Sequence, residues 1–124
     1  MLRLLARIRY RAKQRREWRR QLRSSPALSR CWEKVRRLPT TEPGFREATA
    51  KLCTPNELIE ERAHYQPWYP EVQADIDNGA NKVARFQLSY AVKGVPQDTY
   101  VTTHYVSTLD SRLLGSTKHT LKGY

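Results

Sequence analysis

The chain has 124 residues and a formal net charge of +11, and this length allows one small domain with tails and a modest core. No stretch approaches the roughly 18 apolar residues of a membrane-spanning helix, so we expect no transmembrane segment. The charge is unevenly distributed. Residues 1–38 carry a net charge of +12, whereas residues 39–124 carry −1. This asymmetry indicates a basic segment that binds an anionic partner.

Residues 1–24 are predicted to form a basic helical arm, because residues 2–23 contain good helix formers and neither Gly nor Pro. Like charges four residues apart repel each other on a helix, so the arm requires a partner that neutralises it. Its Arg-rich, acid-poor composition is also typical of a mitochondrial transit peptide. We expect the segment to be retained and to bind its partner through Arg7, Arg11, Arg15, Arg19 and Arg20.

Residues 25–79 are predicted to form a helical core. Ser25 and Pro26 favour the start of a helix that Pro39 ends. The apolar spacing in residues 45–52 predicts a short helix, and Thr54 with Glu57 forms a capping box for a helix over residues 55–65. Pro70 opens one or two further helical turns that end near Gly79.

Residues 80–106 are predicted to form a β-hairpin, because apolar residues alternate with polar ones between residues 82 and 93. Residues 94–98 read as a turn, and residues 99–106 are β-branched and aromatic. We expect residues 107–124 to form an extended tail that lies on another surface. The predicted fold is therefore mainly α, with short helices and proline-punctuated turns, a small C-terminal β-hairpin and an extended tail, and so α+β overall.

Signatures of catalysis are missing from the sequence, which contains no G-x-G-x-x-G, P-loop or H-E-x-x-H motif. His64, His104 and His119 stand apart from one another, and we expect no catalytic residue, cofactor or metal site. Cys31 and Cys53 favour two buried thiols, and a single disulfide between two helices is the alternative.

A second candidate contact lies between residues 65 and 70, where aromatic residues flank Pro67. Tryptophan and tyrosine are enriched at protein interfaces, so Trp68 and Tyr69 are predicted to contact a neighbouring subunit. The alternative is a local mini-core formed with the helix that carries Trp32.

Two respiratory-chain subunits share motifs with this chain. Arg36-Arg37-Leu38-Pro39, the proline-started segment 55–59 and the aromatic segment 65–72 resemble the 14 kDa matrix-side subunit of the cytochrome bc1 complex. The chain departs from that family by a shorter middle helix and by everything after Asn78.

Residues 32–39, 45–52 and 57–61, with Pro67-Trp68, are similar to the 13 kDa hydrophilic-arm subunit of respiratory complex I. Each resemblance covers about a third of the chain. Both imply an accessory (supernumerary) subunit that faces the mitochondrial matrix and carries no redox centre.

We therefore expect a non-catalytic structural or assembly subunit of a respiratory-chain complex on the matrix face of the mitochondrial inner membrane. It would bridge neighbouring subunits, and its arm would lie on acidic subunits and anionic lipid headgroups. The alternative is a mitochondrial ribosomal protein whose arm neutralises phosphates of ribosomal RNA.

Overall fold

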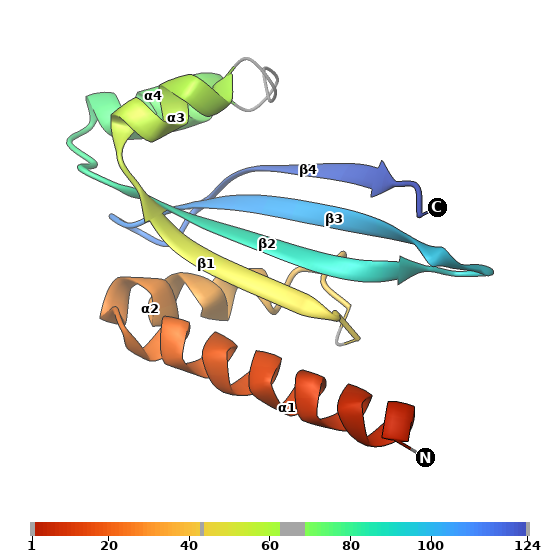
Figure 1. The fold of residues 1–124 in the computed structure, drawn as a ribbon. Coiled ribbons are helices and arrows are strands. Elements are labelled where there is room, and N and C mark those ends of the chain that lie inside the picture. The colour runs from red at the N-terminus through yellow and green to blue at the C-terminus, as the bar shows by residue number, and fades with distance from the viewer. Residues whose placement is uncertain (1, 43, 63–68, 124) are drawn as a thin grey trace.

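The computed structural model describes residues 2–42, 44–62 and 69–123, and it shows an α+β domain built on a four-stranded antiparallel sheet (Figure 1). Helices α1 (Leu2–Arg23) and α2 (Pro26–Val35) lie against one face of the sheet. Helices α3 (Pro55–Arg62) and α4 (Tyr69–Asp77) lie over one end of the opposite face. The sheet is therefore the middle layer of the domain.

The strands pair in their order along the chain, which makes the sheet a meander interrupted once by α3 and α4. They are β1 (Glu47–Cys53), β2 (Val83–Val92), β3 (Val95–Ser107) and β4 (Leu113–Leu121). Gly94 has φ of +82° in the tight connection between β2 and β3, a conformation that glycine adopts without a steric cost.

The helix boundaries follow local capping chemistry. Ser25 accepts a hydrogen bond from the N–H of Leu28 at 3.4 Å, so it is the N-cap of α2. Thr54 and Glu57 exchange hydrogen bonds of 3.3 Å at the start of α3, which confirms the predicted capping box. Helix α4 ends before Gly79, whose φ of +102° suits a left-handed cap.

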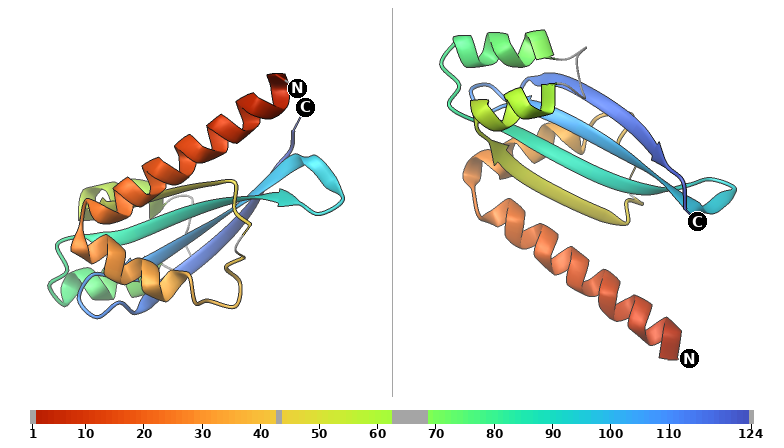
Figure 2. Two further views of the ribbon diagram at one scale, coloured as in Figure 1. Left: turned by 90° about the horizontal axis from the view of Figure 1, so that it is seen from below. Right: turned by 45° about the horizontal axis from the view of Figure 1, so that its top comes forward.

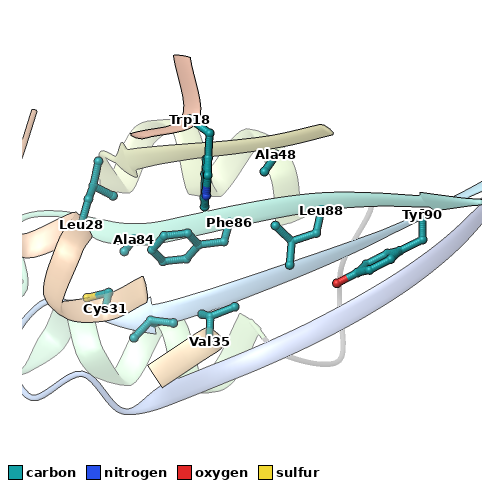
Figure 3. Close-up of a cluster of buried hydrophobic side chains, with 10 residues drawn as sticks. Trp18, Leu28, Cys31, Val35, Ala48, Ala84, Phe86, Leu88 and Tyr90 are labelled. Carbon is teal, nitrogen blue, oxygen red and sulfur yellow. The ribbon is translucent and has the colours of Figure 1, made fainter. Parts of the chain in front are cut away.

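The larger core lies between the sheet and the first two helices (Figure 3). Alternate residues of β2 project into it, and the helices supply one tryptophan and three smaller side chains. Its principal members are Ala84, Phe86, Leu88 and Tyr90 of β2, Trp18 of α1, and Leu28, Cys31 and Val35 of α2. A smaller core joins α3 and α4 to the other face of the sheet through Cys53, Leu58, Val72, Val83, Tyr105 and Leu114.

The prediction of a mainly α fold with a small hairpin is wrong, because two segments outside the hairpin are strands. The helix predicted over residues 45–52 is replaced by Glu47–Cys53, which pairs with β2 along its whole length. Alanine, glutamate and lysine favour a helix locally, but pairing places Ala48 beside Leu88 and Ala50 beside Phe86 on the core side. Burial of that face overrides the local preference.

The second correction concerns the predicted tail. Its residues 113–121 form β4, which pairs with β3 from Thr99 to Val106. The turn before it is held by local hydrogen bonds: the N–H of Arg112 bonds the carboxylate of Asp110 at 3.0 Å, and Ser107 N–H bonds the carbonyl of Arg112 at 2.8 Å. An aspartate that bonds the backbone two residues later is a turn signal, so the sequence did contain a marker for this hairpin.

Candidate docking surface on helix α1

The C-terminal half of α1 is fixed to the domain by Trp18, whose side chain is only 8% exposed. Its ring meets Trp32 of α2 edge-to-face, with centroids 4.9 Å apart. Phe45 and Phe86 approach it similarly, at 6.1 Å and 6.4 Å. Edge-to-face aromatic contacts are favourable beyond the area they bury. Trp18 is therefore the anchor of the arm, a role that the charged residues around it in the sequence did not indicate.

Two polar contacts join α1 to β1, which is an edge strand of the sheet. The side-chain carbonyl of Gln21 accepts a hydrogen bond of 2.8 Å from the N–H of Ala50. Nearer the N-terminus, the hydroxyl of Tyr10 donates to the carboxylate of Glu47. Because this hydrogen bond favours the protonated phenol, it raises the pKa of Tyr10. Helix α1 thus covers the edge of β1, and sequence patterns alone did not indicate either contact.

Toward its N-terminus, α1 diverges from the sheet and from α2 (Figure 2). Every residue from Leu2 to Tyr10 is exposed. The complete helix carries nine arginines and one lysine against the single acidic residue Glu17, which gives it a net charge of +9. The basic character predicted for the arm is therefore displayed on a projecting helix.

The predicted contact residues Arg7, Arg11, Arg15, Arg19 and Arg20 are all exposed. Arg7 and Arg11 precede Trp18 by about three and two helical turns, so they lie on the same side of α1 as the anchor, beyond the region where α1 meets the core. Arg20 lies on the opposite side. Arg15 and Arg19 continue the row of Arg7 and Arg11 at intervals of four residues, so one partner surface can contact these four arginines, whereas Arg20 needs a contact from another side of the helix.

The charge pattern makes the projecting half of α1 a poor helix in water. Arg3, Arg7, Arg11 and Arg15 follow one another at intervals of four residues, and each such like-charged pair destabilises a helix. The first turn contains no acidic residue, so nothing there complements the positive end of the helix dipole. An anionic partner would relieve both penalties.

A shallow, open hollow lies between side chains on successive turns near the C-terminal end of α1. It is lined by Lys13, Arg16, Glu17, Arg19, Arg20 and Arg23. Five cations and one carboxylate in this arrangement form a cationic surface rather than an enclosed ligand pocket. Arg19 and Arg20 are the two predicted contact residues that belong to it.

The second predicted contact, formed by Trp68 and Tyr69, falls outside the side chains that the structure describes. Trp68 lies outside the described residues, and so does the side chain of Tyr69, although the backbone of Tyr69 begins α4. The proposed role of these two aromatic residues therefore remains a prediction.

Cys31 and Cys53 are both buried and free. They belong to the two different cores, on opposite faces of the sheet, so the structure contains two thiols instead of a disulfide between helices. Burial raises the pKa of each thiol because a thiolate would lose its hydration.

Within the part of the chain that the structure describes, no group of three or more His, Cys, Asp or Glu side chains is arranged to hold a metal ion. Among the same residues, no helix has the length and apolar character needed to cross a membrane. Of the histidines, His104 is buried, His119 is exposed, and His64 lies outside the described residues.

Comparison with known protein families, with characterised proteins and with solved structures finds no match to this chain.

Proposed function

We propose that this protein is a non-catalytic subunit that is held in a larger mitochondrial assembly by helix α1. The observation that carries the proposal is the projecting half of α1, whose residues 2–10 are all exposed and which belongs to a helix of net charge +9. A charge of this size on one helix favours an anionic partner. The folded domain would be the part presented to neighbouring subunits.

The assembly that we propose is a respiratory-chain complex, with the protein on the matrix face of the inner membrane. The two sequence resemblances described above support this assignment, as does the Arg-rich composition of α1, which is typical of mitochondrial targeting. In this role the protein bridges neighbouring subunits and performs no reaction.

A mitochondrial ribosomal protein is the second candidate, and one observation favours it. Arg9, Arg16 and Arg20 lie on the side of α1 opposite Trp18, so cations surround the helix instead of forming one stripe. Phosphate groups on several sides, as in folded RNA, suit such a helix.

The experiment that tests the proposal compares two variants with equal loss of charge. One replaces Arg7, Arg11, Arg15, Arg19 and Arg20 with glutamine, and its matched control replaces the exposed cations Arg46, Lys82, Lys93, Arg112 and Lys122. Tagged chains are expressed in cells with a fixed heterologous targeting sequence, so that the substitutions do not alter import. We expect the arm variant, but not the control, to be depleted from large particles on native gels.

The particle that contains the wild-type chain then identifies the assembly. Haem and flavin absorption indicate a respiratory complex, whereas strong absorption at 260 nm by RNA indicates a ribosome. Equal incorporation of the arm variant and the control variant would contradict the docking role of α1.

A further inference from the structure

The projecting half of α1 carries an exposed apolar stripe in addition to its charge. Leu4, Leu5 and Ile8 are 60%, 48% and 53% exposed, and their spacing of three and four residues places them on one side of the helix. The stripe lies about a quarter turn around α1 from Trp18, so the folded domain does not cover it. Neighbouring leucine and isoleucine side chains exposed in this way mark a surface that becomes buried in a complex.

Cations border the stripe on both sides. Arg7 and Arg11 lie along one flank and Arg9 along the other, and the first acidic residue of the helix is Glu17. Ala12 continues the stripe for one more turn, and Arg15 then interrupts it. The amphipathic part of α1 is therefore confined to residues 2–12, most of which precede Tyr10, where the helix contacts Glu47 of β1.

The apolar stripe and the arginines beside it together distinguish between RNA and an anionic membrane as the partner of α1. RNA phosphates would neutralise the arginines but would leave Leu4, Leu5 and Ile8 in water. A bilayer with anionic headgroups satisfies both features, because apolar side chains enter the boundary of the acyl chains while arginines extend to the phosphates. Eleven residues of helix span only about 16 Å, which is enough to lie in a membrane surface but too short to cross it.

We infer that residues 2–12 of α1 lie in the surface of an anionic lipid bilayer, with Leu4, Leu5 and Ile8 inserted and the flanking arginines bound to headgroup phosphates. The inference rests on the proposed function, in which α1 binds an anionic partner, and it identifies that partner as lipid. The sheet and the other helices stay outside the bilayer, joined to the arm through the Trp18 anchor.

The test is co-sedimentation of the full chain with phosphatidylcholine vesicles that either contain or lack phosphatidylserine. One variant replaces Leu4, Leu5 and Ile8 with glutamine. Its matched control replaces Ile59, Leu109 and Leu121, which are 55%, 54% and 56% exposed elsewhere on the domain. We expect the wild type and the control to bind the anionic vesicles. The variant of Leu4, Leu5 and Ile8 should bind them about a hundredfold more weakly, because three apolar side chains are no longer buried.

A fluorescent label reports insertion directly. Cys31 and Cys53 are buried, so a cysteine introduced at Ile8 or Ala6 is the accessible thiol for an environment-sensitive dye. These two positions lie on nearly opposite sides of the helix. We expect a blue shift on anionic vesicles from the label at position 8 and a much smaller one from the label at position 6.

Two results would overturn the inference. Equal vesicle binding by the wild type and the variant of Leu4, Leu5 and Ile8 would mean that the arginines bind lipid without insertion of the apolar side chains. That result would leave the proposed docking role of α1 intact. Binding of wild type to poly(U) RNA without binding to anionic vesicles would assign the arm to nucleic acid. Failure of the proposed function itself is seen separately, as unchanged incorporation of the arginine variant on native gels.

Discussion

The side-chain carbonyl of Gln21 lies 2.8 Å from the backbone nitrogen of Ala50 and accepts its hydrogen bond. Ala50 belongs to β1, whose other edge pairs with β2, so Gln21 satisfies a backbone donor on the free edge of the sheet. Unpaired edge donors are templates for association with other chains. Helix α1 therefore both projects the basic arm and protects the sheet edge along which it lies.

Replacing Gln21 with alanine is expected to lower the free energy of unfolding by about 1 kcal/mol, because Ala50 N–H loses its acceptor in a partly buried position. Urea denaturation followed by circular dichroism measures the effect. Arg20→Ala, at an exposed neighbouring position, is the control and should change stability little. If Gln21→Ala and Arg20→Ala have the same stability, the hydrogen bond does not hold α1 on the sheet.

Trp18→Ala is expected to cost about 3–5 kcal/mol, since it removes a large side chain from the centre of an aromatic cluster. Trp18→Phe retains part of the packing and should cost less. The loss should also release α1, so limited trypsin digestion should cut the Arg-rich helix of Trp18→Ala faster than that of the wild type. An alanine variant with wild-type stability would show that Trp18 is not the anchor.

His104 predicts a pH dependence of stability. Its Nδ1 lies 2.7 Å from the hydroxyl oxygen of Ser116, and its Nε2 has no hydrogen-bond partner among the described residues. Burial lowers the pKa of His104 below its ordinary value of 6.5, because a charged imidazolium would be poorly solvated there. The unfolded chain therefore binds a proton more readily than the folded chain.

The free energy of unfolding should consequently fall as the pH decreases below 6.5, and it should level off once the pH is below the pKa of the folded state. Denaturation of wild type and His104→Gln across this range isolates the contribution, because the other two histidines are common to both chains. A difference between the two proteins that does not change with pH would show that His104 is not the cause.

Several parts of this fold could be read from the sequence because their signals are local. The N-cap at Ser25, the capping box at Thr54 and the alternation in β2 each occupy a few residues, and the structure contains all three. Strand β1 could not be read in this way, because its alanines, glutamate and lysine favour a helix until β2 pairs with them.

The candidate docking surface was predictable in composition but not in geometry. The charge of α1 can be counted from the sequence, and the five predicted arginines are indeed exposed. Where the helix leaves the domain depends on Trp18 meeting rings from α2 and β2, and on Gln21 meeting β1, which are contacts between segments distant in the chain. No local pattern encodes them.

The side chain of Ser107 is expected to stabilise the domain by joining α4 to the turn that precedes β4. Its hydroxyl donates to the carboxylate of Asp75 at 2.8 Å and accepts from the N–H of Leu109 at 3.1 Å, and the side chains of Ser107 and Asp75 are both buried. Ser107→Ala should lower the free energy of unfolding by about 2 kcal/mol, because it leaves a buried carboxylate oxygen unpaired. Thr120→Ala, at an exposed position of β4, is the control for thermal and urea unfolding. Equal stability of the two variants would show that the hydrogen bonds of Ser107 do not stabilise the fold.

The helicity of the arm should depend on its partner. With Arg3, Arg7 and Arg11 at intervals of four residues and no acidic residue in the first turn, residues 2–10 should exchange their amide hydrogens much faster than residues 16–23 in the free protein. Hydrogen exchange measured by mass spectrometry should show protection of residues 2–10 when anionic vesicles are added. The variant Arg7→Glu should be better protected than the wild type without them, because the introduced carboxylate lies four residues from both Arg3 and Arg11 and replaces two repulsive pairs with attractive ones. Strong protection of residues 2–10 in the free wild type would contradict the argument that this helix needs an anionic partner.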